Sequence, residues 1–358
     1  MTLASGLESS GGVSALKALY DSTLEPYLAA RDAPLLAARR RRWLVLAVGL
    51  TIAAGVLVWA IQSTTDNEFG PMVAFGLVVG SAGYFWLSRA ALADDVRHEL
   101  MSRIAVFLGL RYEPSAAGFD LERFALLGLA AYDKARRTDR LFGEAGGLAV
   151  DMMAARLADE TSTGIGSERQ TRTIERFSGL LVRIRDPMPQ AADTRFRLVP
   201  PAGASDRAML RDISIVTHTS SSGQPMPSMA DLERMLTAGP EAAPRTPTGD
   251  AAFDARFELH ALGPAVPAAL ARLDAGTRGA LLDIASCFGG GAVSVGFDGG
   301  DILLAFVTQQ RFEIGPLRPP MAQFERVRHL AEQMGILTAI ADRLRTARET
   351  DAARPAPA

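Results

Sequence analysis

Two stretches near the beginning of the chain contain no charged residue and are mostly apolar. The first covers residues 43–61 and the second covers residues 72–88. A helix rises about 1.5 Å per residue, so the first stretch would be roughly 29 Å long, close to the thickness of the hydrocarbon core of a bilayer. Trp43 and Trp59 lie near its two ends, where indole rings favour the headgroup level. The pattern therefore predicts two transmembrane helices.

The short polar connection between these stretches predicts a hairpin over residues 43–88, with both chain termini on the same side of the membrane. Basic residues flank the hairpin on its outer ends: Arg39, Arg40, Arg41, Arg42 and Arg89. The connection itself carries only Asp66 and Glu68. Because positive residues stay on the cytoplasmic side, both termini are expected in the cytoplasm.

Small residues in the second stretch recur at helical spacing. Gly76 and Gly80 form a GxxxG pair, and Gly83 lies one turn further along. Glycines at this spacing allow a neighbouring helix to approach closely. Two interpretations stay open for this helix-packing face: it packs against the first span of the same chain, or it mediates homo-oligomerisation.

The segment before the hairpin divides into two parts. Residues 1–12 are rich in Ser and Gly and are expected to be disordered. Residues 13–38 are expected to form an amphipathic helix, because Leu16, Tyr20, Leu24 and Leu28 recur at helical spacing. Pro26 is expected to kink this helix.

The remainder predicts an α+β domain over residues 94–347, with a mostly antiparallel sheet and flanking helices. Residues 119–132 read as a mostly apolar helix, whereas residues 174–185 alternate as a strand does. Asp298, Gly299, Gly300 and Asp301 separate two further apolar runs, which predicts a β-hairpin. The Pro- and Gly-rich residues 237–251 are a candidate division of the domain into two halves, and residues 348–358 are expected to be a disordered tail.

Composition excludes several classes of function. The chain has 38 Lys and Arg against 40 Asp and Glu, so no net positive charge favours a nucleic-acid partner. Cys287 is the single cysteine, so the chain can form neither an intramolecular disulfide nor a thiolate zinc cluster. No two of the four His are four residues apart, and no catalytic, cofactor-binding or metal-binding motif occurs. We therefore expect no cofactor and no enzymatic activity.

Four arginines in the long strand candidate form a candidate basic face: Arg172, Arg176, Arg183 and Arg185. Such a face would attract anionic lipid headgroups at a membrane surface. The alternative is a face whose arginines form ion pairs with neighbouring Asp and Glu.

Short segments spread along the chain carry a resemblance to a known family. They are the leading helix with Pro26, YEPSAAGF at residues 112–119, FSGL at residues 177–180, FDARFEL from Phe253 and FDGGDILLAF from Phe297. The chain resembles an uncharacterised bacterial family, a domain of unknown function, of double-spanning membrane proteins with a soluble C-terminal α+β domain. The resemblance implies a multi-pass protein of the bacterial inner (cytoplasmic) membrane. The acidic segment usual in that family is reduced here to Glu144.

Together these patterns predict a membrane-anchored, non-enzymatic interaction or regulatory module whose soluble domain faces the cytoplasm. Its partners would be the lipid bilayer and either an unidentified protein or further copies of the chain. The alternative is a protein or enzyme that binds lipid headgroups at the membrane surface.

Overall fold

The computed structural model describes residues 10–62, 69–129, 132–163, 170–185, 195–201, 218–219, 245–261, 265–287, 292–308, 312 and 321–352. The chain divides into two compact units. We call the first, which consists of Ser9–Ile104 and Ile314–Ala331, the helical unit. The second, which contains Ala105–Glu313 and Glu332–Ala358, is the sheet unit.

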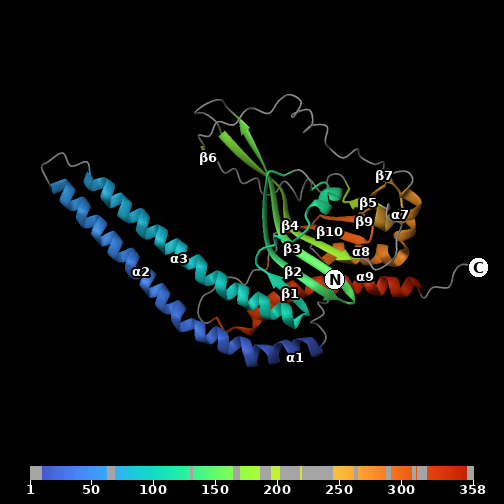
Figure 1. Ribbon diagram of the computed structural model, residues 1–358, viewed down its shortest axis with the longest axis horizontal. Coiled ribbons are helices and arrows are strands. Elements are labelled where there is room, and N and C mark those ends of the chain that lie inside the picture. The colour runs from blue at the N-terminus through green and yellow to red at the C-terminus, as the bar shows by residue number, and fades with distance from the viewer. Residues whose placement is uncertain are drawn as a thin grey trace, which may run out of the picture. The chain divides into compact units, whose positions relative to one another are not determined.

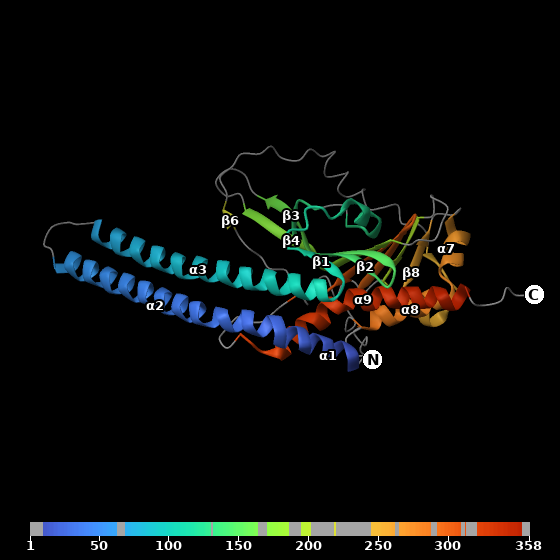
Figure 2. The same ribbon diagram turned by 60° about the horizontal axis from the view of Figure 1, so that its bottom comes forward.

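The helical unit begins with α1 (Ser10–Leu19), the π-helical turn η1 (Tyr20–Leu24) and α2 (Glu25–Gln62). After the connection comes α3 (Phe69–Phe107), which lies beside α2 in both views (Figures 1 and 2). One expectation is corrected here, because helix replaces the expected disorder at residues 10–12. Residues 13–38 and 43–61 are joined by continuous helix. Burial of Leu16 stabilises α1 despite its Ser- and Gly-rich start.

The π-helical turn explains how Pro26 fits into an otherwise continuous helix. Proline lacks the N–H that would bond to the carbonyl four residues earlier, and its ring crowds that carbonyl. The preceding turn widens in response, so the Glu25 N–H donates to the Tyr20 carbonyl. Ser22 Oγ donates to the Ala18 carbonyl at 2.8 Å. The distortion expected at Pro26 thus takes the form of one π turn.

The apolar face expected for the N-terminal helix is buried within the helical unit. Leu16, Tyr20, Leu24 and Leu28 are all at most 4% exposed. The Tyr20 ring meets Phe324 edge to face, with ring centroids 5.4 Å apart. This N-terminal part of the chain therefore packs against residues from near its C-terminal end.

Within the described residues, neither α2, α3 nor any other helix offers a stretch both long enough and apolar enough to cross a membrane.

The sheet unit confirms the expected α+β class with an antiparallel sheet. Its strands follow the order β1-β2-β3-β4-β10-β9-β5-β8-β7, and β6 pairs with β4. The strands are β1 (Leu110–Glu113), β2 (Lys134–Ala145), β3 (Leu148–Thr163), β4 (Gln170–Arg185), β5 (Arg195–Val199), β6 (His218–Thr219), β7 (Arg245–Thr246), β8 (Glu258–Ala261), β9 (Val293–Asp298) and β10 (Asp301–Val307). The expected hairpin joins β9 to β10, and Gly299 supplies its positive φ of 58°.

Helices cover one face of this sheet. They are α6 (Ala251–Asp254), α7 (Val266–Arg272), α8 (Ala275–Cys287) and the part of α9 (Phe324–Ala352) that follows Glu332. Figure 2 shows α8 and α9 side by side, and Arg343 Nη1 of α9 donates to Asp283 Oδ2 of α8 at 3.0 Å. Buried residues of the strands, such as Val182, Ile184 and Val295, alternate with residues of the opposite face.

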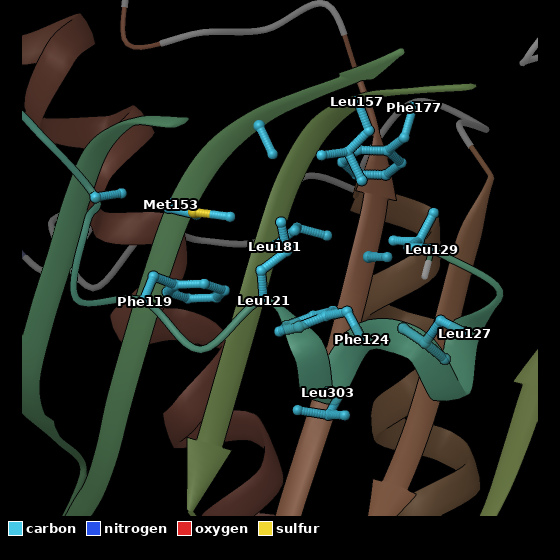
Figure 3. Close-up of a cluster of buried hydrophobic side chains, with 13 residues drawn as sticks. Phe119, Leu121, Phe124, Leu127, Leu129, Met153, Leu157, Phe177, Leu181 and Leu303 are labelled. Carbon is cyan, nitrogen blue, oxygen red and sulfur yellow. The ribbon is translucent and has the colours of Figure 1, made fainter. Parts of the chain in front are cut away.

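The opposite face is covered by the 3-10 helix η2 (Glu122–Leu127) and the segment before it. Figure 3 shows Phe119, Phe124 and Leu127 packed onto Met153 of β3, Leu181 of β4 and Leu303 of β10. Only this short 3-10 helix forms where a longer helix was expected over residues 119–132, because Gly128 turns the chain with a φ of 81°.

Two further expectations about domain boundaries are corrected by the sheet unit. Strand β5 precedes residues 237–251 and β8 follows them, yet the two strands are hydrogen-bonded neighbours. Both sides of this segment therefore share one sheet instead of forming two halves. At the C-terminus, α9 continues through residues 348–352, which were expected in the disordered tail, and residues 353–358 lie outside the described part.

Candidate functional site

The α2–α3 pair exposes large apolar side chains along both helices. The most exposed include Leu44 (63%), Trp59 (59%), Met72 (73%) and Phe75 (71%). Soluble monomers rarely expose a contiguous apolar surface of this kind, and such surfaces mark contact with a membrane or a partner. We call this exposed surface of α2 and α3 the apolar hairpin surface.

Helices α2 and α3 approach each other closely at Gly49. A Cβ atom at this position would lie 2.0 Å from Ser81 Oγ and 2.9 Å from Ser81 Cβ. In contrast, a Cβ atom at Gly76, Gly80 or Gly83 would meet no described atom within 4 Å. Among the described residues, Gly49 therefore makes a close contact between the two helices, and the role of the three glycines of the second stretch stays a prediction.

The flanking arginines, which the sequence analysis uses to orient the hairpin, lie in α2 and α3 at the outer ends of the two apolar stretches. The side chains of Arg40 and Arg41 are exposed on α2. The side chains of Arg39, Arg42 and Arg89 lie outside the described residues.

The candidate basic face lies on β4, where acidic side chains accompany two of its arginines. Arg176 forms an ion pair with Asp159 of β3, and Arg183 Nη2 lies 2.8 Å from Asp301 Oδ2. Arg185 is exposed, and the side chain of Arg172 lies outside the described residues. For Arg176 and Arg183 this arrangement matches the ion-paired alternative.

Asp301, at the start of β10, is the centre of an ion-pair network. Its side chain is 6% exposed and accepts from Arg183 and from Arg123 Nη1, the latter at 2.7 Å. Arg123 also pairs with Asp120 at 2.9 Å. A buried carboxylate is stabilised by two guanidinium groups in this way, which ties η2 to the β9–β10 turn.

A second network surrounds Arg140 of β2. Its Nη2 lies 2.8 Å from Asp151 Oδ2, and its Nη1 lies 3.1 Å from Glu113 Oε2. The hydrogen bond to Asp151 raises the pKa of Arg140. Next to it, Asp139 adopts a φ of 56° where the pairing of β2 with β3 shifts register. Aspartate tolerates this left-handed conformation, and Tyr112 Oη donates to its carboxylate at 2.8 Å.

Beyond η2, polar residues line the same face of the last strands of the sheet. We call this surface the β5–β8 polar face and define it by Arg195, Arg197, Arg245, Glu258 and His260. Arg197 lies directly opposite His260, which in turn lies opposite Arg245. Three potential cations therefore form a row across three neighbouring strands.

Acidic partners accompany two of the three arginines of this face. Arg195 Nε lies 2.6 Å from Asp298 Oδ1, and Arg245 Nη1 lies 3.3 Å from Glu258 Oε1. Arg197 is half-buried, and burial lowers the pKa of its guanidinium. Among the described residues, no carboxylate lies within ion-pair distance of Arg197. It remains protonated, because a guanidinium is too strong a base to lose its proton at neutral pH.

In the described part of the chain, no group of three His, Cys, Asp or Glu side chains is placed to hold a metal ion. The sequence interpretation did not single out Arg197 and His260. The alternation of polar and apolar residues in RFRLV and ELHA places both on the polar side of their strands and is the signal that identifies them.

Comparisons of the chain with protein-family models, with curated proteins and with solved structures find no match. The resemblance carried by residues 112–119 and by the β9–β10 hairpin stays a prediction from the sequence.

Proposed function

We propose that this protein is a membrane-anchored interaction module: the α2–α3 hairpin inserts into a bilayer and holds the sheet unit at the cytoplasmic surface. The observation that carries the proposal is the apolar hairpin surface. Each Leu, Val or Phe moved from water into hydrocarbon gains about 1.5–3 kcal/mol. Leu44, Trp59, Met72 and Phe75 are all more than half exposed, and a bilayer would cover them.

The proposal rests on two observations together: the exposed apolar side chains of α2 and α3, and the two uncharged stretches in the sequence. The described residues contain no helix long and apolar enough to cross a membrane. The first uncharged run continues in the sequence through Ala60 and Ile61, whose side chains lie outside the described residues. Residues 43–61 and 72–88 would form the two spans.

Flanking charges support the orientation. Arg40 and Arg41 are exposed in the turn of helix α2 that directly precedes the first apolar stretch. Basic residues near the ends of transmembrane helices stay in the cytoplasm, so both termini would lie there. For a bacterial protein this corresponds to the inner membrane.

The pairing of charges in the sheet unit favours interaction over catalysis. Asp301 and Asp151, which are largely buried, are engaged by arginines, and such networks stabilise strand register. A module of this kind would act through a protein partner or through further copies of itself.

Membrane insertion is tested on the full chain expressed in a bacterium. The wild type should stay in the membrane fraction after alkaline carbonate washing. Phe75→Asp with Val79→Asp places two charges in the second apolar stretch and should move the protein into the washed supernatant or the degraded pool. Val106→Asp is the matched control, because Val106 is 71% exposed on the same helix but lies beyond the stretch. Quantitative release of the wild type by carbonate would refute insertion.

The interaction role is tested by affinity purification from neutral detergent. A partner, or a second copy of the chain, recovered at fixed stoichiometry would support it. A monodisperse monomer that co-purifies with nothing would count against it.

A further inference from the structure

We propose that Arg197 is the centre of an anion-binding site on the β5–β8 polar face, and that the site takes a phosphate group. The proposal does not depend on insertion of the hairpin into a membrane. It concerns residues of the sheet unit alone.

Among the described residues of this face, one arginine has no acidic partner. Arg195 is paired with Asp298 and Arg245 with Glu258. Within the described part of the sheet unit, Arg197 has no carboxylate in reach. Half-buried charges are normally compensated, because removing a charge from water is costly without a partner. An anion from solution would supply the missing compensation.

Arg197 has a different neighbour on each of its two sides in the sheet. On one side its cross-strand neighbour is Gly296 of β9, where a Cβ atom would lie 3.1 Å from the side chains of both Leu126 and Leu127. The apolar side chains of η2 therefore cover Gly296 beside Arg197. On the other side lies His260, whose side chain is 14% exposed. Partial exclusion of water strengthens an ionic hydrogen bond at such a position.

The side chains of Arg197, His260 and Arg245 favour a phosphate group as the ligand. A guanidinium presents a planar fork of N–H donors that matches two oxygens of a phosphate. His260 and Arg245 follow on the next two strands and place further N–H groups in the same row as Arg197. Glu258 Oε2 lies 3.8 Å from His260 Nε2 on the same strand. The same chemistry fits inorganic phosphate and the phosphate of a lipid headgroup.

The test uses the full chain in neutral detergent. Inorganic phosphate is titrated at constant ionic strength, and binding is followed by calorimetry. A parallel titration uses mixed micelles that contain phosphatidic acid, with diacylglycerol micelles as the phosphate-free reference. Arg197→Gln should weaken binding by about tenfold or more, which corresponds to the loss of a bidentate charge-assisted contact. Arg136→Gln removes an exposed guanidinium from β2 of the same unit and should leave the affinity unchanged.

The outcomes separate the two sources of phosphate. Saturable binding of inorganic phosphate that phosphatidic acid does not exceed assigns the site to a soluble phosphate compound. Tighter binding of phosphatidic acid micelles that Arg197→Gln abolishes assigns it to a headgroup. If Arg197→Gln does not fold, Arg197→Lys keeps the charge without the fork and should still bind several-fold more weakly. Wild-type affinity in a folded Arg197 variant, or no saturable binding of either probe, would overturn the proposal.

Discussion

Replacing Gly49 by Ala should loosen the contact between α2 and α3, whereas the same change at Gly55 should not. Both glycines lie within α2. A Cβ atom at Gly49 would lie 2.9 Å from Ser81 Cβ, and one at Gly55 would meet no described atom within 4 Å. The two variants therefore share the effect of the substitution on the helix and differ only in the collision.

The magnitude follows from the distances. Carbon atoms pack at about 3.5–4.0 Å, so the two helices must separate locally by roughly 0.6–1 Å. Ser81 Oγ can rotate away, but Ser81 Cβ cannot. Overpacking of this kind costs about 1–3 kcal/mol. The better helix propensity of Ala recovers up to about 1 kcal/mol at either position. We expect Gly49→Ala to be about 1–3 kcal/mol less stable than Gly55→Ala.

The assay compares both variants as full chains in the same detergent. A denaturant titration followed by circular dichroism gives the free energy of unfolding. Amide hydrogen exchange then locates the loss, which should be concentrated in α2 and α3 around the contact.

A third variant separates collision from other causes. Ser81→Gly removes both atoms that the new methyl group would meet, so it should restore most of the stability lost in Gly49→Ala. Equal stability of Gly49→Ala and Gly55→Ala would refute the close approach at Gly49. Failure of Ser81→Gly to rescue would show that the loss arises elsewhere.

Three further predictions concern the sheet and the N-terminal helix. Gly179→Ala should destabilise the fold by more than about 3 kcal/mol in denaturant titrations, because its Cβ would lie 1.8 Å from the Phe306 carbonyl oxygen in the adjacent strand. Asp301→Asn should cost about 2–3 kcal/mol, because the largely buried carboxylate accepts from Arg183 and a second arginine; a double-mutant cycle with Arg183→Gln measures the pairwise share. Burial raises the pKa of Tyr20 above its ordinary 10.0, so its contribution to stability is fully present below that pH and is lost as the pH rises through the raised value; Tyr20→Phe should remove this alkaline dependence in unfolding scans.

Each of these three predictions has a control variant or a result that would contradict it. Gly279→Ala lies in α8 with no described atom within 4 Å of the new methyl group, so it should be neutral or slightly stabilising. For Asp301, purely additive losses in the cycle would show that the pair is not coupled. For Tyr20, an alkaline unfolding profile that is the same in wild type and Tyr20→Phe would place the titrating group elsewhere.

Local patterns in the sequence were enough to predict the elements whose buried side chains alternate along one strand or recur along one helix. Strand β4 and the β9–β10 hairpin follow from alternating apolar residues and from Gly299 in a two-residue turn. The uncharged second stretch predicted a helix over residues 72–88, and α3 contains it and continues to Phe107. The backbone hydrogen bonds and the buried face of these elements depend on residues that are close together in the sequence.

Strand β2 shows where such reasoning ends. Its sequence, KARRTDRLFGEA, buries few side chains and contains no regular alternation, so nothing local predicts a strand. It is a strand because β1 and β3 both pair with it, and because Arg140 and Asp151 meet across the β2–β3 pair. Tertiary pairing outweighs weak local propensity here.

The sequence by itself determined the apolar stretches, the flanking charges and the class of fold, because each depends on neighbours in the chain. Only the tertiary structure decided which charges meet. Arg183 and Asp301 are 118 residues apart and lie together because of strand register, whereas Arg197, on the same face, has no described acidic partner. It also decided that Gly49 of α2 lies close to Ser81 of α3. Register and helix rotation are properties of packed pairs, and no segment specifies them alone.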